Sequence, residues 1–122
     1  MWGAVAALSP QAVHDLAMYF STIPPRPANN GEPELAAQGR SIYDNGIPDA
    51  NIVACVVCHA PNAEGIRQIP RLAGLTHSYL KRKLEQWGEG YHSGTPSPTP
   101  MVARHLGPDE IEALASYLSF VR

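Results

Sequence analysis

The run Ala54-Cys55-Val56-Val57-Cys58-His59 constrains this 122-residue chain more than any other feature. The chain has 2 cysteines, Cys55 and Cys58, which are too few for the disulfide framework of a small secreted domain. Thiols at this spacing can form thioethers with the vinyl groups of a haem, and the histidine that follows can reach the iron. The run therefore predicts one haem c, attached through Cys55 and Cys58 and ligated by His59.

Three other uses of the cysteine pair remain open at this point. A thioredoxin-like redox pair would need a strand and a βαβ context, which the sequence does not show. A structural zinc site would need four ligands. A plain disulfide would leave His59 without a role. The histidines outside the run, which a zinc site would have to use, are isolated from one another: His14, His77, His92 and His105.

The length and composition fit one domain whose centre is not filled by side chains alone. Two full domains would not fit comfortably into 122 residues. Aromatic residues make up 7% of the chain and prolines number 12, which leaves little material for a well-packed core. A cofactor at the centre would replace the core that the sequence does not supply.

The charge pattern gives no reason to expect a nucleic-acid partner. The net charge is −2, and no block of like charge is longer than Lys81-Arg82-Lys83. No apolar run approaches the ~20 residues of a membrane span. The first residues lack the basic leader and long apolar region of a secretory signal, so an export signal would lie outside this sequence.

Apolar spacing and helix-ending residues predict an all-α fold, and no stretch competes as a strand. A first helix should follow Ser9-Pro10, a capping residue and a proline at the first helical position. The prolines and the Asn-Asn-Gly run between Thr22 and Pro33 exclude a helix there. The other three expected helices run from Pro33 or Glu34 to about Asp44, from Thr76 to Gly88, and from Gly107-Pro108 onward.

The first and last of these helices are similar at a constant offset of 98 residues. Six of the fourteen positions 8–21 are identical to their counterparts: Leu8, Pro10, Leu16, Ala17, Tyr19 and Ser21 match Leu106, Pro108, Leu114, Ala115, Tyr117 and Ser119. The similarity suggests a repeat that is cut short at its start. The alternative is that two amphipathic helices with proline at the first position share letters by chance.

Haem iron takes a sixth ligand besides the porphyrin nitrogens and His59, and that ligand decides what the site can do. Met101, 42 residues after His59 and next to a Pro-rich loop, is the candidate. A thioether favours reduced iron, and a full coordination shell leaves no position for oxygen or peroxide. This predicts electron transfer rather than bond chemistry. His92 and His105 are the rival ligands, whereas Met18 is interpreted as packing.

Taken together, these motifs make the chain resemble the class I c-type cytochromes. The resemblance is strongest to small bacterial cytochromes and to the domains of dihaem cytochrome c4-like proteins. The resemblance rests on Gly39-x-x-x-Tyr43, the Cys-x-x-Cys-His run, the segment 70–75 (Pro-Arg-Leu-Ala-Gly-Leu), Met101 and the final Leu-Ala-x-Tyr-Leu. It covers residues 33–122. It implies an all-α class I cytochrome c fold, in which helices wrap around one covalently bound haem, with an extra N-terminal helix.

The resemblance also implies roles for single residues. The carbonyl of Pro70 should accept a hydrogen bond from the imidazole of the ligating histidine. Gly39 and Tyr43 should contact the last helix at Leu114, Tyr117 and Leu118. Three further residues are expected near the haem propionates: Arg67, Tyr79 and Trp87. The chain departs from the family where Ala60 stands in place of the usual glycine and where His92 lies in a stretch that often carries arginine.

For the parts of the chain, the resemblance implies three segments. Residues 1–23 should be a helix like the end of a preceding cytochrome domain, residues 24–32 a Pro-rich linker, and residues 33–122 the cytochrome c domain. The expected function is one-electron transfer in the periplasm with redox partner proteins. The alternatives are a haem domain of a larger oxidoreductase, or a ligand-binding haem sensor if Met101 is not bound.

Overall fold

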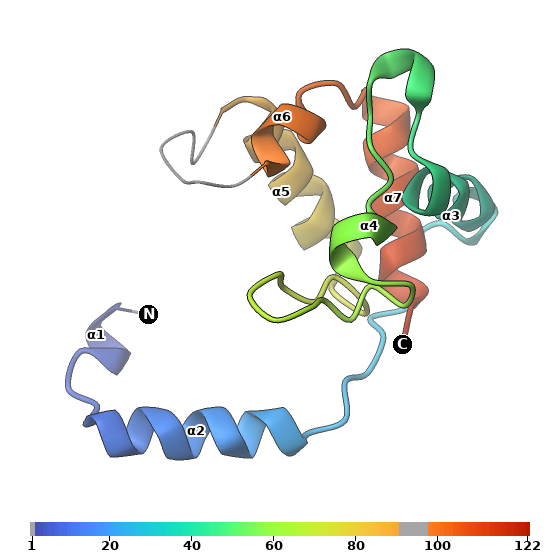
Figure 1. Cartoon of the computed structure of the whole chain (residues 1–122). Helices are drawn as coiled ribbons and strands as arrows, with labels where there is room; N and C mark the ends of the chain where they lie inside the picture. The colour runs from blue at the N-terminus through green and yellow to red at the C-terminus, as the bar shows by residue number, and fades with distance from the viewer. Residues whose placement is uncertain (1, 91–97) are drawn as a thin grey trace.

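The computed structural model describes residues 2–90 and 98–122, and over these residues the chain is helical and contains no strand (Figure 1). The all-α prediction is confirmed, and the four expected helices are present. In chain order the elements are α1 (Trp2–Val5), α2 (Pro10–Thr22), η1 (Pro33–Leu35), α3 (Ala36–Asn45), η2 (Pro48–Ala50), α4 (Val56–His59), α5 (His77–Gly88), α6 (Thr99–Ala103) and α7 (Pro108–Phe120). None of the described helices is long and apolar enough to cross a membrane.

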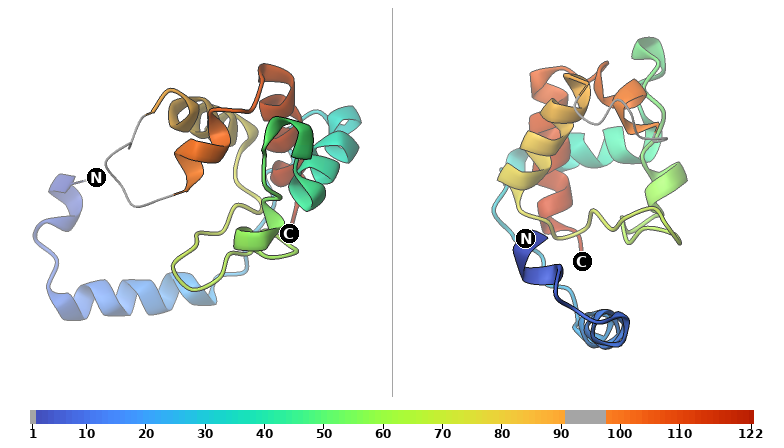
Figure 2. Two further views of the ribbon diagram at one scale, coloured as in Figure 1. Left: turned by 45° about the horizontal axis from the view of Figure 1, so that its top comes forward. Right: turned by 90° about the vertical axis from the view of Figure 1, so that its left-hand side faces the viewer.

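Helices α3 and α7 cross at close range, and α5 packs against α7 as well (Figure 2). The close approach depends on Gly39, because a Cβ at this position would overlap the carbonyl of Ala113. One turn further along α3, the ring of Tyr43 lies 5.6 Å from the ring of Tyr117. The expected contact between the two helices is therefore present.

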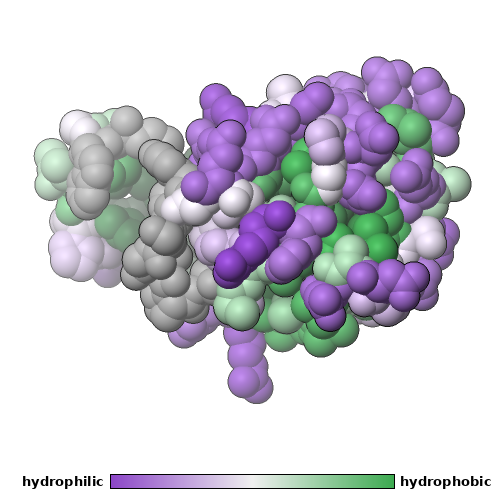
Figure 3. Space-filling model, turned by 90° about the horizontal axis from the view of Figure 1, so that it is seen from above, coloured by the Kyte–Doolittle hydropathy of each residue, from purple (hydrophilic) through white to green (hydrophobic). Residues whose placement is uncertain are grey.

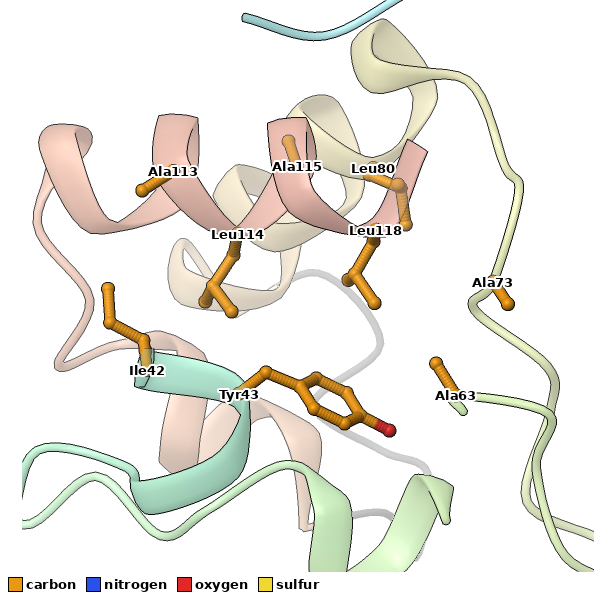
Figure 4. Close-up of a cluster of buried hydrophobic side chains, with 9 residues drawn as sticks. All are labelled: Ile42, Tyr43, Ala63, Ala73, Leu80, Ala113, Leu114, Ala115 and Leu118. Carbon is orange, nitrogen blue, oxygen red and sulfur yellow. The ribbon is translucent and has the colours of Figure 1, made fainter. Parts of the chain in front are cut away.

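The buried core is small and made mostly of alanine and leucine side chains around α7. Figure 4 shows Leu114 and Leu118 projecting from α7 toward the side on which Tyr43 lies. Ala63 and Ala73, from the loops between α4 and α5, complete the same cluster. Such short side chains fill little volume, which agrees with the thin core that the composition indicates.

The residue that ends α4 has an unusual backbone conformation. Ala60 has φ +67° and ψ 164°, a region that is normally open only to glycine. The buried hydroxyl of Tyr43 donates to the Ala60 carbonyl at 2.6 Å, and burial raises the pKa of Tyr43 far above its usual value. Ala60 therefore has the backbone conformation of a glycine, at the position where the family that the sequence resembles usually has glycine.

Residues 28–32, here called the linker strap, are bound to the domain by hydrogen bonds. The backbone N–H groups of Gly31 and Glu32 donate to the hydroxyls of Ser119 and Ser116, each at 3.1 Å. Asn30 accepts the N–H of His77 through its side chain at 3.0 Å, at the start of α5. Because both serines are fully buried in α7, the strap is part of the folded domain.

The helix α2 lies apart from this domain. No residue of α2 is buried, and no other helix of the described part contacts it (Figure 1). Its start is as expected, since Ser9 caps it by accepting the N–H of Ala12 at 3.1 Å and Pro10 is its first residue. The large apolar side chains exposed on or just after it are Val13, Leu16, Met18, Tyr19, Phe20 and Ile23.

Candidate haem-binding site

The single turn of α4 places Cys55, Cys58 and His59 along one wall of a cavity. The N–H groups of Cys58 and His59 both donate to the carbonyl of Cys55, at 3.2 and 2.9 Å, which closes the turn. Because Cys55 and Cys58 are three positions apart, they lie on one face of this turn. All three side chains line the cavity, and both cysteines are free.

The protonation of Cys55 argues against a thioredoxin-like redox pair. Burial raises the pKa of the Cys55 thiol to about 11, and the charge of Cys58 adds to the shift. Cys55 is therefore a thiol at neutral pH and not the reactive thiolate of a redox pair. Among residues 2–90 and 98–122, no group of three or more His, Cys, Asp or Glu side chains could hold a metal ion.

The ring of His59 is held by the backbone of a distant loop. Its Nδ1 lies 2.9 Å from the carbonyl oxygen of Pro70, and a carbonyl can only accept, so Nδ1 carries the proton of this hydrogen bond. The other ring nitrogen, Nε2, then has a lone pair for a metal. The loop returns to His59 because Gly65, at φ +80°, donates its N–H to the His59 carbonyl at 2.9 Å.

The cavity has a volume of about 480 Å³, which is within the range of small-molecule sites. Its walls come from residues 53–59, the loop 70–75, α5, α6, Leu106 and the face of α7 that carries Leu114 and Leu118. Seen from above, apolar surface is visible between the hydrophilic side chains of the domain (Figure 3). Two of the expected propionate neighbours, Tyr79 and Trp87, line the cavity.

Two of the expected site residues do not line the cavity. Arg67 is exposed and has φ +55° in the loop after α4. Met101 lies in α6 and is 63% exposed, although its neighbours Thr99 and Val102 both face the cavity. Both roles stay predictions.

The rival ligands to Met101 are no nearer to the site. His105 is exposed and is not part of the cavity wall, and His92 lies outside the described residues. Within the described part of the wall, His59 is the one imidazole.

Two basic residues that the sequence did not assign to the site line the cavity, Arg71 and Lys83. The Nε of Arg71 donates to the Ala73 carbonyl at 3.0 Å. Its Nη2 is buried and has no hydrogen-bond partner among the described residues. The signal available was its place next to Pro70, whose carbonyl holds His59.

These residues fit a covalently bound haem. The apolar walls suit the porphyrin, the two thiols suit its vinyl groups, and the Nε2 of His59 suits the iron. When bound, haem c supplies a one-electron couple between ferric and ferrous iron.

Comparison with known proteins agrees with the site. The chain is 34% identical to cytochrome c4 of Stutzerimonas stutzeri over 97% of its own length and 58% of that protein. It is 31% identical to the thiosulfate dehydrogenase electron acceptor of Thiomonas intermedia, covering 98% of the chain and 57% of the relative. The chain thus spans less than two thirds of these curated relatives.

A solved structure shows the same fold. The crystal structure of reduced recombinant cytochrome c4 from Pseudomonas stutzeri matches with a TM-score of 0.85 and 33% identity, over 98% of this chain and 65% of that one. The family profile described as Cytochrome c matches residues 36–121, which include the attachment run, the cavity walls and α7. The chain therefore belongs to the cytochrome c family and carries the attachment residues for one haem c.

Proposed function

We propose that this chain transfers one electron at a time through a single haem c. The observation that carries the proposal is the joint placement of Cys55, Cys58 and a His59 ring held by Pro70 on one wall of an apolar cavity. The thioethers would fix the haem in place, and the Pro70 carbonyl would fix the imidazole and strengthen it as a ligand. The low polarity of the walls disfavours the more highly charged ferric state and raises the reduction potential.

For the sixth ligand we propose Met101. It belongs to α6, which forms part of the cavity wall, and it is joined to residues that already face the cavity. In Figure 2 (left), α4 and α6 lie apart. Residues of both helices and of α5 line the same cavity. Because the Met101 side chain is exposed, ligation requires this side chain to turn inward when the haem is present.

Optical and redox spectroscopy of the haem-loaded chain tests both proposals. We expect a reversible one-electron titration and, in the oxidised protein, the weak thioether-to-iron band. Met101→Ala should abolish that band and let carbon monoxide bind to the reduced haem. Met18→Ala is the matched control, since Met18 is similarly exposed but lies on α2. An unchanged band in Met101→Ala would show that Met101 is not the sixth ligand. Ready binding of carbon monoxide to the unaltered protein would instead favour the ligand-binding sensor.

We also propose that residues 1–23 are the end of a preceding cytochrome domain and that residues 24–32 connect it to the domain of residues 33–122. The support is the contrast in burial between equivalent residues at the offset of 98. Leu16 is 42% exposed in α2, whereas its counterpart Leu114 is 1% exposed in α7. The same holds for Phe20 and its counterpart Leu118. An exposed apolar face like that of α2 is typical of a helix that packs against a domain of its own.

The resemblance to dihaem cytochrome c4-like proteins supports a longer parent protein with a second haem. The chain covers 58% of cytochrome c4 of Stutzerimonas stutzeri and 65% of the solved cytochrome c4 chain, so a longer parent protein has room for a further domain. Because covalent haem attachment in bacteria takes place outside the cytoplasm, we place the protein in the periplasm. Finding a second Cys-x-x-Cys-His run upstream of residue 1 in the parent gene would support this architecture, and an upstream segment without one would contradict it.

A second candidate function is that of an electron acceptor for a dehydrogenase. The observation in its favour is the 31% identity to the thiosulfate dehydrogenase electron acceptor of Thiomonas intermedia, over 98% of this chain. Stopped-flow mixing of the oxidised protein with a thiosulfate dehydrogenase and thiosulfate would test it. Rapid haem reduction that depends on the enzyme supports the acceptor role, and reduction no faster than with thiosulfate alone excludes this partner.

A further inference from the structure

The hydroxyl of Tyr43 is a buried polar group that packing alone does not explain. The side chain is fully buried, and the hydroxyl donates to the Ala60 carbonyl at 2.6 Å. Figure 4 shows the hydroxyl end of the ring directed toward the loop that carries Ala63. The contact of α3 with α7 needs only the ring, which a phenylalanine would supply equally well. What the hydroxyl adds to this contact is the hydrogen bond to Ala60.

The acceptor, Ala60, has a strained backbone. An alanine keeps φ +67° and ψ 164° only where the contacts around it over-determine this conformation. The N–H of Ala60 donates to the Val56 carbonyl at 3.1 Å, and its carbonyl accepts the N–H of Ala63 at 3.0 Å. The bond from Tyr43 is the shortest of the three and the one that comes from another helix. Since Ala60 is buried, water does not readily replace this bond.

Ala60 belongs to a closed ring of contacts that includes both the backbone and the imidazole of His59. The carbonyl of Ala63 accepts the N–H of Leu72 at 2.8 Å. Two residues before Leu72, the Pro70 carbonyl accepts the Nδ1 proton of His59 at 2.9 Å. His59 and Ala60 are neighbours in the chain, which closes the ring. A rotation at Ala60 therefore moves the segment that carries the Pro70 carbonyl relative to the imidazole.

We infer that Tyr43 is a positioning residue for the iron ligand. Its hydroxyl holds the Ala60 carbonyl and thereby keeps the Pro70 carbonyl within hydrogen-bond distance of the His59 ring. The inference rests on the proposed function, since it takes His59 as the ligand of a bound haem. Without the hydroxyl, Ala60 relaxes from its strained conformation and the bond from Nδ1 to Pro70 weakens. Because that bond makes the imidazole a stronger electron donor, its weakening disfavours ferric iron and raises the reduction potential.

Exchange of the Nδ1 proton of His59 with deuterated solvent tests this inference. It is followed by NMR of the reduced, haem-loaded protein labelled with nitrogen-15. Tyr43→Phe keeps the ring and removes the hydroxyl. In this variant the Nδ1 proton should exchange several-fold faster relative to the amide of Leu114, a buried residue of α7 that reports the opening of the whole domain, and the reduction potential should rise. Tyr117→Phe is the matched control, because its ring lies 5.6 Å from that of Tyr43 but belongs to α7, and it should change neither quantity.

Ala60→Gly separates the positioning role from a general loss of stability. Glycine adopts the conformation of Ala60 without strain, so the force that moves the Pro70 carbonyl is absent. In the Ala60→Gly background, Tyr43→Phe should therefore accelerate the exchange of the Nδ1 proton less than it does in the unaltered protein.

Three results would overturn the inference. The first is an Nδ1 exchange rate or a reduction potential that stays unchanged in Tyr43→Phe. The second is equal acceleration at Nδ1 and at the Leu114 amide, which would mean that the hydroxyl contributes to stability alone. The third is an equally large effect of Tyr43→Phe in the Ala60→Gly background, which would mean that the hydroxyl does not act through the conformation of Ala60.

If Tyr43→Phe alone does not load haem, loading by the double variant with Ala60→Gly decides the question. Restored loading supports the inference, and continued failure overturns it. The proposed function is judged separately, by whether the unaltered protein titrates reversibly with one electron.

Discussion

Replacing Gly39 with alanine should destabilise the domain strongly, because the crossing of α3 and α7 has no space for a methyl group. The added Cβ would overlap the Ala113 carbonyl and lie 2.7 Å from the Cβ of Tyr117. The conflicting Ala113 atoms are backbone, so no side chain can turn away, and the two helices must separate. Overpacking of this kind typically costs ~1–3 kcal/mol, with larger values where the backbone is involved.

The helix propensity of alanine opposes this cost but does not cancel it. Glycine within a helix is less favourable than alanine by about 0.5–1 kcal/mol. Because the conflict is with backbone atoms, the upper end of the overpacking range, about 3 kcal/mol, applies, and the net loss for Gly39→Ala is about 2 kcal/mol. For a domain of this size each kcal/mol lowers the melting temperature by about 4–8 °C, so a decrease of about 10 °C or more is expected.

Thermal unfolding of the haem-loaded ferric protein, followed by circular dichroism, measures this decrease. Gly3→Ala is the matched control, because Gly3 lies in α1 with nothing within 4 Å of an added Cβ. That variant should melt like the unaltered protein. If Gly39→Ala also melts within about 2 °C of it, the helices can move apart at little cost, and the reasoning from close packing is refuted.

Two further predictions concern the other faces of α7. Ser119→Ala removes the acceptor of the Gly31 N–H, so we expect the free energy of unfolding to fall by about 1 kcal/mol. Amide exchange should become faster at Gly31 but not in α3. Unchanged exchange at Gly31 would mean that this bond does not hold the linker strap. The hydrogen bond from Lys81, at 2.6 Å, lowers the pKa of Glu112 below its usual value of 4.5. Stability from ionised Glu112 is thus present above that pH and lost as the pH falls through the lowered pKa, so the melting temperature of Glu112→Gln should fall less steeply in acid. Parallel acid curves for the two proteins would show that this pair does not contribute.

The attachment run and the long helices could be predicted because their signals are local. Three residues in fixed spacing identify the haem chemistry, and apolar periodicity identifies the helices. The short α6 was not predicted, since Thr99 and Pro100 follow a Pro-rich loop and only packing against α5 stabilises a helix of five residues there. The orientation of the Met101 side chain depends on the haem. The residues next to Met101 in the sequence therefore do not predict it.

Arg71 lines the cavity and Arg67 does not, and the sequence could not show this for a similar reason. The loop after α4 reverses direction at several residues with positive φ, among them Ala63, Gly65 and Arg67. Such backbone conformations are set by hydrogen bonds to distant groups, and each one changes which side chain faces inward. A periodic pattern does not exist in a loop of this kind, so two nearby arginines look equivalent until the chain is folded.

The helix α7 connects the parts of the molecule that these predictions address. On one face Leu114 and Leu118 line the cavity, and on another Ala113 lies against Gly39. The buried hydroxyls of Ser116 and Ser119 hold the linker strap. The strap therefore leaves the domain at a point fixed relative to the wall of the haem cavity. If residues 1–23 end a preceding cytochrome domain, this attachment limits how far the two haems can move apart, because only residues 24–27 lie between Ile23 and the strap.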